Sequence, residues 1–518
     1  MMAAKQTYQG EGVLLKDLLK GIADVDVSTL GEVLVLGLSA DSRRLGPGDL
    51  FLACGGTVTK GHSYIDDAIK YGACAVLFES TVEDYVAQAQ PSVPVLGVEN
   101  LSEKLGLLAD RFYGSPSKEL VVTGVTGTNG KTSCSHIIAH ALSKAMSTPA
   151  GVMGTLGYGL CGNLSEASHT TPDSITMHRL LRDMKKQGAK DVVMEVSSHG
   201  LDQGRIVGVE VDVAVFTNIS RDHLDYHKTM QAYVDTKKRL FGLPSLKCAV
   251  VNLDDVYANE IVDAVSPFRK VVGYTLNADV LTESKISARV ESVIHGSIVN
   301  TSMLGSEVFV ECAWGRDSFT TSLLGEFNVS NLLAALGVLL WRGVGFAEAL
   351  ARLSTVRPLS GRMEVVARHD ASPIVVIDYA HTPDALEKAL CAIKRLSNQR
   401  LWCVFGCGGN RDSGKRALMG RVAEQYADLV IVTDDNPRTE SPHSIVNDIL
   451  SGMSKPEDVH VIHNREKAIQ YALQNAQGDE VVLIAGKGHE DYQEVNGERH
   501  FFSDHAVVLA YSVSESSL

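Results

Sequence analysis

Short apolar runs alternate with amphipathic segments along most of this chain, and no other feature limits its fold so strongly. The runs in the middle of the chain are LVVTGVTG, DVVMEVSS, VDVAVFTNIS and KCAVVNLDD. Those nearer the C-terminus are SPIVVIDYA, RLWCVFGCGG, DLVIVTDDN, DVHVIHN and EVVLIAGKG, separated by segments of helical periodicity such as ALEKALCAIKRL and REKAIQYALQNA. Continuous apolar strands between helices predict an α/β fold with a mostly parallel sheet covered on both faces.

Length and turn-rich segments predict the domain organisation. A chain of 518 residues exceeds what one hydrophobic core can serve, so we expect three domains. The turn-rich stretches GSPSKEL and TVRPLSGR indicate the boundaries. The predicted domains are a small N-terminal α/β domain at 1–116, a central domain with a phosphate-type loop at 117–356, and a C-terminal Rossmann-like domain at 357–518.

Composition narrows the class of protein. The formal net charge of −14 argues against general affinity for nucleic acid or anionic membranes. The nine cysteines form no zinc motif, and the closest pair, Cys403 and Cys407, is interpreted as reduced thiols. The N-terminus lacks the apolar core of a signal peptide, and the apolar stretch 331–341 is too short to span a membrane. We therefore expect a cytoplasmic, monomeric protein without nucleic-acid partners or membrane insertion.

Polar, glycine-bearing sequences follow the predicted strands. In the last segment these are DYAHTPD, GCGGNRD, TDDNPR and GKGHE, and in the middle they are GTNGKT, Glu195 and NISRDHLDYH. Parallel sheets bind ligands beyond the carboxyl ends of their strands. Two such clusters in neighbouring domains predict a cleft between the domains in which the reaction takes place.

The stretch TGVTGTNGKTS, Thr123–Ser133, follows one of the apolar strands and opens a helical segment. Its glycines would let backbone N–H groups face phosphate oxygens, while Lys131 would hold the β- and γ-phosphates and Thr132 would bind Mg²⁺. The common form of this loop has a glycine where Val125 stands. A tight turn with an exposed lysine is the alternative interpretation.

A carboxylate and two histidines near this loop are candidate metal ligands. Glu195 ends an apolar strand, where a Mg²⁺ ligand or a solvent-exposed strand terminus would equally explain it. His223 and His227 are four residues apart and could share a helix face. Structural histidines are the alternative for this pair.

The motifs GTNGKTS, HTTPDS, EVSSHGLDQGR, NISRDHLDYH, GEFNVSN, DYAHTPDALE, GCGGNRDSGKR, DDNPRTE and GKGHE occur in this order. Together they resemble the Mur ligases, most closely the tripeptide-forming members, over about Asp41 to Asp504. A non-glycine before GTNGKT is usual in this family, which explains Val125.

The resemblance implies an ATP-dependent carboxylate–amine ligase of peptidoglycan precursor synthesis. ATP would phosphorylate the D-glutamate carboxylate of UDP-MurNAc-L-Ala-D-Glu, and the amine of meso-diaminopimelate would attack the resulting acyl phosphate. The implied partners are these two small molecules, and the implied cofactors are ATP, Mg²⁺ at two sites and a carbamylated Lys237. Domain closure would gather the ligands and exclude water.

The resemblance also implies the nucleotide and metal residues. The catalytic positions match Lys131, Glu195, His223 and Lys237. The ATP-binding positions match Gly127, Thr128, Asn129, Gly130, Lys131, Thr132, Ser133, Asn331, Arg362, Asp378 and His381. The metal ligands would be Thr132, Glu195, His223 and Lys237 as a carbamate, because a bare ammonium cannot coordinate Mg²⁺. Adjacent Lys238 is the competing candidate, and the family's spacing from His223 favours Lys237.

Further matches concern the two substrates. Those for the UDP-linked substrate are Ser42, Thr57, Thr59, Thr170, Thr171, Ser197, Gln203 and Arg205. Ordinary surface threonines are the alternative for Thr57 and Thr59. Those for diaminopimelate are Arg411, Asp435, Asn436, Pro437, Arg438, Gly486 and Glu490. Arg438 would bind the remote carboxylate, which lysine lacks, and Glu490 the remote ammonium.

Competing functional interpretations make different predictions. A lysine-adding relative or a folylpolyglutamate synthetase is the nearest alternative, and Arg438 and the uridine-type N-terminal segment argue against both. A P-loop motor or regulatory ATPase would hydrolyse ATP without an amino-acid substrate. A non-catalytic nucleotide-binding module would not need Lys131, Glu195 and Lys237 together.

Overall fold

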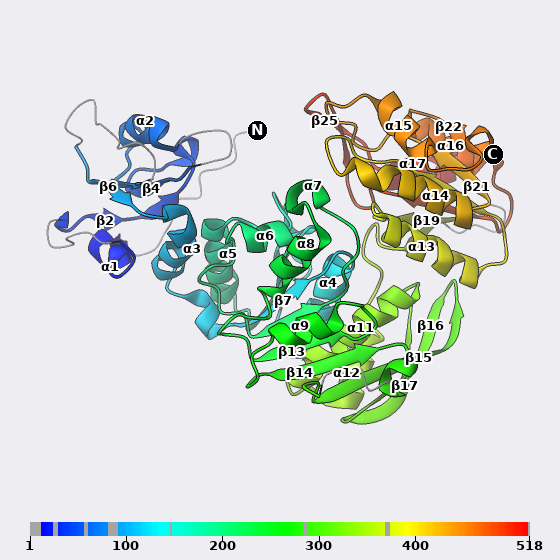
Figure 1. Ribbon diagram of the computed structural model, residues 1–518, viewed down its shortest axis with the longest axis horizontal. Coiled ribbons are helices and arrows are strands. Elements are labelled where there is room, and N and C mark those ends of the chain that lie inside the picture. The colour runs from blue at the N-terminus through cyan, green and yellow to red at the C-terminus, as the bar shows by residue number, and fades with distance from the viewer. Residues whose placement is uncertain are drawn as a thin grey trace. The chain divides into compact units, whose positions relative to one another are not determined.

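The computed structural model describes residues 12–23, 30–55, 61–80, 92–145, 148–282, 288–367 and 373–515 (Figure 1). Its contacts divide the chain into two compact units. The first unit comprises 1–122, 151–192 and 199–211, and the second comprises 123–150, 193–198 and 212–518. The predicted domain boundaries by residue number stay predictions.

The first unit contains a four-stranded parallel sheet in the order β3-β4-β5-β6. Its strands are β3 Gly37–Ser39, β4 Asp49–Ala53, β5 Ala75–Glu79 and β6 Val95–Val98. Alternate residues of β4 enter two different cores: Leu50 and Leu52 pack with α1 (Leu15–Leu19) and α3 (Leu101–Phe112). Phe51 and Ala53 pack with α2 (Ile65–Lys70) on the other face. This is the layered α/β arrangement that the sequence predicts.

The first unit also contains three antiparallel strands and a packed pair of helices. The antiparallel strands are β8 Gly151–Gly154, β9 Gly157–Leu160 and β10 Asn163–Ser165. Helix α5 (Ser174–Lys186) packs against α3, and its buried His178 lies with Nε2 2.9 Å from the Val207 carbonyl oxygen.

Eight strands of the 11-stranded sheet follow the order β11-β7-β12-β13-β14-β15-β16-β17. The strands are β7 Val121–Thr126, β11 Asp191–Glu195, β12 Val213–Phe216, β13 Cys248–Asn252, β14 Lys270–Thr275, β15 Ser292–Ser302, β16 Gly305–Cys312 and β17 Gly315–Thr321. Strands β7, β12, β13, β14 and β15 run parallel, and β15, β16 and β17 form antiparallel pairs.

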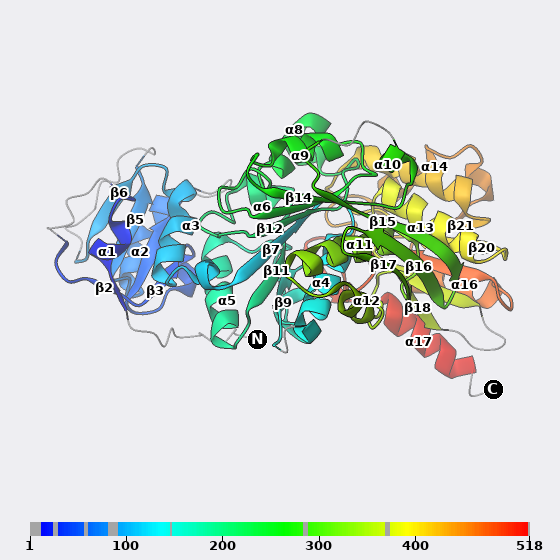
Figure 2. The ribbon, with the colours of Figure 1, turned by 90° about the horizontal axis from the view of Figure 1, so that it is seen from below.

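Helices cover both faces of this sheet, as Figure 2 shows. Helices α8 (Met230–Lys238) and α9 (Ala258–Ala264) lie on one side. Helices α4 (Lys131–Ala145), α11 (Glu326–Trp341) and α12 (Phe346–Leu353) pack together on the other. The predicted mostly parallel sheet with helices on both faces is confirmed.

A second, six-stranded sheet has the order β18-β19-β23-β20-β21-β22. Its strands are β18 Glu364–Ala367, β19 Ile374–Asp378, β20 Leu401–Phe405, β21 Leu429–Val432, β22 His460–Val461 and β23 Val481–Ala485, and all but β18 run parallel. Helices α13 (Pro383–Leu396), α14 (Arg416–Tyr426) and α15 (Pro442–Leu450) share one core with it. Helices α16 (Arg465–Asn475) and α17 (Asp504–Glu515) share the other.

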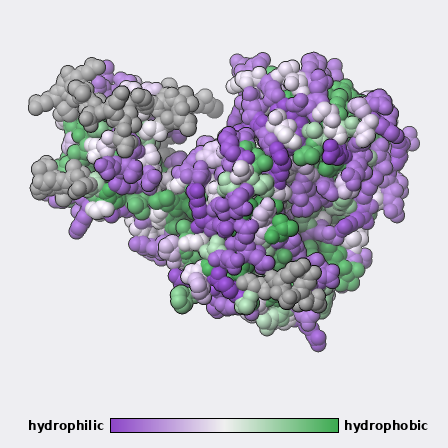
Figure 3. Space-filling model, viewed as in Figure 1, coloured by the Kyte–Doolittle hydropathy of each residue, from purple (hydrophilic) through white to green (hydrophobic). Residues whose placement is uncertain are grey.

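Within the described part of the chain, every helix is too short or too polar to cross a bilayer. Figure 3 shows a face covered mainly by hydrophilic side chains, with apolar ones in small scattered groups. Most apolar residues of the strands lie in the buried cores between the sheets and their helices.

Candidate active site

The stretch after β7 forms a tight loop that opens α4. Gly127 and Gly130 have φ angles of 152° and 83°, and a Cβ at Gly127 would lie 1.9 Å from Thr217 Oγ1. Glycine is therefore required there by close packing. The Lys131 ammonium donates hydrogen bonds to the carbonyl oxygens of Gly127 (3.0 Å) and Thr128 (2.9 Å). The strand–loop–helix context predicted for a phosphate-binding loop is present.

Thr132 and Glu195 meet at the end of the loop. The Thr132 hydroxyl donates to Glu195 Oε2 at 3.0 Å, and both residues are buried, with Glu195 only 1% exposed. Arg362 Nη2 donates to the same hydroxyl at 3.3 Å. This placement excludes the solvent-exposed strand terminus as an explanation of Glu195.

Lys237 and Lys238, the two candidates for modification, have opposite environments. Lys237 is 1% exposed, donates to the Gly127 carbonyl oxygen at 2.8 Å and lies 4.6 Å from the centroid of the Tyr233 ring. Burial, reinforced by the Lys131 charge, lowers the pKa of Lys237 well below its ordinary value. Lys238 instead pairs at the surface with Asp235 and Glu260, each at 3.3 Å.

Asp222 and His223 face the same loop. His223 caps the short helix α7 (Leu224–His227) with φ at 54°, and its Nε2 lies 3.3 Å from Asp222 Oδ2. Burial opposes ionisation of Asp222, but His223, His381, Lys415 and Lys131 outweigh it and lower the pKa of the carboxyl to about 2. The loop is thus flanked by a carboxylate that sequence analysis did not select.

The loop is also tied to the C-terminal sheet. The Asn129 backbone N–H donates to Asn218 Oδ1 at 3.0 Å, and Asn129 Nδ2 donates to Asp384 Oδ2 at 2.8 Å. Asp384 lies in the first turn of α13, whose N-cap, Thr382, donates to Asn129 Oδ1 at 3.4 Å. A single loop residue therefore links both sheets of the second unit. Ser133 follows in the first turn of α4.

Three further predicted nucleotide residues surround Tyr379. The Arg362 guanidinium lies 4.3 Å from the centroid of the Tyr379 ring, and His381 Nδ1 lies 2.9 Å from the Tyr379 carbonyl oxygen. Burial lowers the pKa of His381 to about 4. Asp378 accepts a hydrogen bond from the Met363 N–H at 2.7 Å, and burial, opposed by Arg362, raises the pKa of its carboxyl to about 6.

Asn331 extends this group from α11. It is 5% exposed, and a Cβ at Gly130 would lie 2.9 Å from Asn331 Oδ1. The amide therefore faces the phosphate loop, as the nucleotide prediction requires.

The predicted residues for the UDP-linked substrate fall mostly in the first unit. Arg205 donates to the Thr171 carbonyl oxygen at 2.7 Å and to Gln203 Oε1 at 2.7 and 3.1 Å. The Thr170 hydroxyl lies 3.0 Å from that of Thr155. Ser42 begins a short 3₁₀ helix, Ser42–Arg44. Ser197 follows β11 in the second unit, and Thr57 and Thr59 lie outside the described residues.

Two arginines flank Gly408, after β20. A Cβ at Gly408 would lie 3.0 Å from Arg438 Nη1 and 4.0 Å from Arg411 Cγ. Arg438 has φ at 53°, donates to the Gly409 carbonyl oxygen at 2.9 Å and pairs with Glu494 at 3.3 Å. Its guanidinium is therefore held by the loop it flanks, with 21% of the side chain exposed.

Buried Arg416 joins the loops that carry these arginines. It is 1% exposed and donates to both carboxylate oxygens of Glu440, at 2.6 and 2.7 Å, and to Asp448 at 2.8 Å. Glu440 in turn accepts from the Asn410 N–H at 2.9 Å. The hydrogen bonds from Arg416 lower the pKa of Glu440 to about 2, so the Glu440 carboxyl that pairs with Arg416 stays ionised at neutral pH.

The remaining predicted amino-acid residues form a buried polar group. Asn436 Nδ2 donates to Glu490 Oε2 at 2.9 Å, and a Cβ at Gly486 would lie 2.7 Å from Asp435 Oδ2. Pro437 is buried beside them, and a Cβ at Gly409 would meet its carbonyl oxygen at 2.0 Å. The four strand-end sequences of this sheet therefore converge as predicted.

Sequence analysis missed Asp222, Tyr379 and Lys487 within motifs that it quoted. Asp222 and Tyr379 each precede or follow a residue that was selected. Lys487 is fully buried between Gly486 and Gly488. A lysine between two glycines directly after a fully apolar strand was the available signal.

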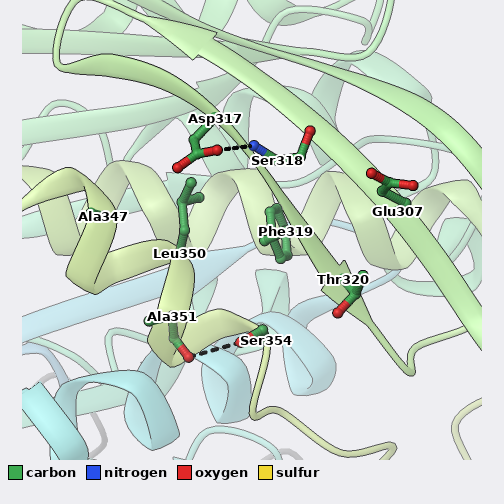
Figure 4. A pocket seen from close by; sticks show the side chains of 9 residues that line it. All are labelled: Glu307, Asp317, Ser318, Phe319, Thr320, Ala347, Leu350, Ala351 and Ser354. Carbon is green, nitrogen blue, oxygen red and sulfur yellow. Dashed lines mark hydrogen bonds between the residues drawn. The ribbon is translucent and has the colours of Figure 1, made fainter.

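A pocket of about 390 Å³ lies between β17 and α12, where Asp317, Phe319 and Leu350 are among its lining residues (Figure 4). None of the predicted site residues lines it. Among the described residues, no three His, Cys, Asp or Glu side chains are gathered as a metal-binding group.

The fold and site define a class: layered α/β proteins in which a phosphate-type loop of one parallel sheet meets the strand ends of a second. Three family models match the chain: the Mur ligase family catalytic domain at 35–113, the Mur ligase middle domain at 125–339, and the Mur ligase glutamate ligase domain at 361–488. The chain belongs to the Mur ligase family.

Similar proteins include two UDP-N-acetylmuramoyl-L-alanyl-D-glutamate–2,6-diaminopimelate ligases. That of Coxiella burnetii is 47% identical over 91% of this chain and 94% of its own length. That of Chromobacterium violaceum is 44% identical over 95% and 98%. A solved structure of a ligase of this name has a TM-score of 0.67 at 34% identity, covering 98% of this chain and 99% of that chain.

A more distant solved structure shares the fold. The MurF ligase of Thermotoga maritima in complex with ADP has a TM-score of 0.61 at 19% identity, covering 87% of this chain and 93% of that chain.

Proposed function

We propose that this protein is an ATP-dependent ligase that joins meso-diaminopimelate to the D-glutamate carboxylate of UDP-MurNAc-L-Ala-D-Glu, in the cytoplasm, during peptidoglycan precursor synthesis. Relatives at 44–47% identity that bear this name match nearly the whole chain. The site residues in the second unit support the same assignment, because a phosphate-type loop and an arginine-flanked polar group occur together there.

ATP is assigned to the phosphate loop and its neighbours. Backbone N–H groups of 127–133 and the Lys131 ammonium would hold the phosphates. Asn331 and Arg362 would position the nucleotide, with Asp378 and His381 at the ribose and phosphates respectively. Burial raises the pKa of Asp378 only to about 6, so at neutral pH its carboxylate is mostly ionised and can accept hydrogen bonds from ribose hydroxyls.

The donor set beside the loop fits Mg²⁺. The Thr132 hydroxyl and the Glu195 carboxylate are buried oxygen donors 3.0 Å apart, and oxygen ligands are what this hard cation prefers. Glu195, Thr132, His223 and Lys237 would hold it at two sites. When bound, Mg²⁺ supplies positive charge that offsets the charge of the phosphate oxygens.

Lys237 would join this set only after modification. Its lowered pKa provides the neutral amine that can attack the carbon of CO₂, forming an N–C bond and releasing a proton. The product is a carbamate, which has the oxygens and negative charge that the amine lacks. Lys238, ion-paired at the surface, has no such access to the loop.

The reaction follows from the poor electrophilicity of a carboxylate. The D-glutamate oxygen attacks the γ-phosphorus of ATP, the bond to ADP breaks, and an acyl phosphate forms. The diaminopimelate amine then attacks the acyl carbon, loses a proton, and phosphate leaves as the amide forms. Lys131 would stabilise the transferred phosphoryl charge during the first step.

Specificity is assigned to the arginine-flanked group after β20, β21 and β23. Arg438 and Arg411 would bind the remote carboxylate of diaminopimelate, and Glu490 its remote ammonium. Lysine keeps the remote ammonium but lacks that carboxylate, so it would bring a cation towards the guanidiniums without the anion that pairs with them. Ser42, Thr170, Thr171, Ser197, Gln203 and Arg205 are assigned to the UDP-linked substrate, together with Thr57 and Thr59.

The observation that carries this proposal is the meeting of the Asn129 loop with α13 of the sheet that bears Arg438. The test is incubation of the purified protein with ATP, Mg²⁺, UDP-MurNAc-L-Ala-D-Glu, and diaminopimelate in competition with lysine. We expect phosphate release to require both substrates and the product mass to correspond to the diaminopimelate adduct. Phosphate release from ATP alone, or a lysine adduct, would contradict the proposal.

A further inference from the structure

Lys487 is a buried cation at the end of β23, beyond the residues assigned above. Gly486 and Gly488, with φ angles of 113° and 53°, bracket it in the sequence GKGHE. These left-handed conformations favour glycine and turn the chain back beneath the strand ends. As a result the lysine side chain points inward and is 0% exposed, where an ammonium normally has a large desolvation cost.

The ammonium is satisfied by the side chains assigned to the amino acid. Lys487 Nζ donates to Asn436 Oδ1 and to Glu490 Oε2, both at 3.1 Å, and lies 3.7 Å from Asp435 Oδ1. Asn436 Nδ2 closes the ring of contacts by donating to Glu490 Oε2 at 2.9 Å. One cation therefore joins two sequence motifs that lie about fifty residues apart, on separate strand ends.

Lys487 offsets the negative charges of Asp435 and Glu490. Asp435 and Glu490 are two acids in one buried group, and like charges oppose each other's ionisation. Burial and the Asp435 charge raise the pKa of Glu490, while Lys487 and the Asn436 hydrogen bond oppose that rise. Without a cation here, the pKa of Glu490 would rise further, and the protonated carboxyl cannot form an ion pair with an ammonium.

The contacts also orient the carboxylate. Glu490 Oε2 is held by both Asn436 and Lys487, whereas Oε1 has a longer contact, 3.5 Å, with the Tyr379 hydroxyl. The side chain of Glu490 retains 16% exposure. Oε1 is therefore the oxygen available to a ligand.

We propose that Lys487 is the positioning residue of the amino-acid site, keeping Glu490 ionised and turned so that its Oε1 pairs with the remote ammonium of the substrate. This inference rests on the proposed function, and deepens it by assigning selection for the remote amine to a lysine that does not itself touch the substrate.

The test compares diaminopimelate with 2-aminopimelate, which keeps the remote carboxylate and lacks the remote amine. The measured quantity is the ratio of kcat/KM for the two amino acids. In the unaltered protein we expect diaminopimelate to be preferred by roughly tenfold or more, the scale of one charge-assisted hydrogen bond. Lys487→Met should bring this ratio close to one by raising the KM for diaminopimelate, with the KM for ATP unchanged.

Two variants separate positioning from general stability. Glu490→Gln alone should also remove the preference, and the double variant with Lys487→Met should reduce the ratio no further, since the lysine acts through the carboxylate. Lys487→Gln, neutral and still able to donate a hydrogen bond, provides the same readout if the Met variant does not fold. Lys394→Met, which removes a surface ion pair with Asp428, is the matched control and should keep the ratio.

The outcomes are distinct. If a folded Lys487 variant loses activity toward both amino acids equally, or if the double variant is additive, the positioning role is wrong. If the unaltered protein does not ligate diaminopimelate at all, the proposed function fails first. A retained preference in both Lys487→Met and Lys487→Gln would overturn the inference alone.

Discussion

Burial sets the ionisation of the residues beside the phosphate loop. Lys131 and Lys237 both have lowered pKa values, because the protein interior disfavours their charged forms. The pKa of Asp222 is also lowered, but this favours the charged form of the carboxyl, because the neighbouring cations outweigh its burial. The motifs predict which residues lie beside the loop. They do not predict the ionisation states of these residues, because those states depend on neighbours distant in the sequence. Asp222 was overlooked for that reason.

Removing CO₂ should inactivate the protein reversibly. A lowered pKa keeps Lys237 neutral down to lower pH than an ordinary lysine, and carbamylation requires that neutral form. Activity should therefore depend on bicarbonate at neutral pH, and this dependence should become stronger as pH falls through the lowered pKa. Phosphate release in CO₂-depleted buffer, with and without bicarbonate, measures it. Lys238→Met should retain the dependence of activity on bicarbonate, and Lys237→Met should abolish activity. The reverse pattern would identify Lys238 as the carbamylated residue.

Arg438→Ala should selectively weaken the use of diaminopimelate. Loss of a guanidinium–carboxylate pair removes about 2 kcal/mol or more, so the KM for diaminopimelate should rise roughly thirtyfold. Steady-state kinetics with each substrate varied in turn would show it, with the KM for ATP nearly unchanged. Arg395→Ala, on the exposed side of α13, is the control. Equal losses for both substrates would count against the assignment of Arg438.

At the scale of elements, strands were predictable where apolar residues are continuous. The runs that became β7, β12, β13, β19, β20, β21 and β23 are buried on both faces, and burial is what makes such runs recognisable. The antiparallel strands β15, β16 and β17 were not foreseen, because polar residues alternate along them and obscure the signal.

Helix α13 connects the nucleotide loop with the second sheet of its unit. Asp384→Ala removes the acceptor of Asn129 Nδ2 and should raise the KM for ATP about fivefold, the effect of roughly 1 kcal/mol for a part-exposed hydrogen bond. Lys388→Met is a matched control, because it removes the surface ion pair of Asp384 and leaves the Asn129 contact. Nucleotide titration of both variants measures the difference. Similar affinities would show that the contact does not support the loop.

One fully buried ion pair, between Arg465 and Asp504, joins two helices of the C-terminal sheet. Arg465 and Asp504 are both fully buried, joined by two hydrogen bonds of 2.8 Å, and hold α17 against the sheet. Arg465 also donates to the Ala485 carbonyl oxygen at 3.0 Å, directly before Gly486. No sequence motif predicts this pair, because Arg465 in α16 and Asp504 in α17 are far apart in the sequence and meet only in the folded structure.

Asp504→Asn should destabilise the protein by about 3–5 kcal/mol, because it leaves a buried guanidinium without its counter-charge. Urea unfolding followed by circular dichroism measures the loss. Arg400→Met, which removes a surface pair with Glu480, should change stability by less than about 1 kcal/mol. Equal, small effects of the two substitutions would mean that the buried pair is dispensable.

The interleaving of the two units has a consequence for synthesis. A ribosome delivers the stretch 123–150 of the second unit before 199–211, the last stretch of the first unit. During synthesis the glycine-rich loop is therefore present before most strands of its sheet have been made. At that stage the first unit still lacks its last stretch, 199–211. A product terminated at 150 would contain neither unit whole.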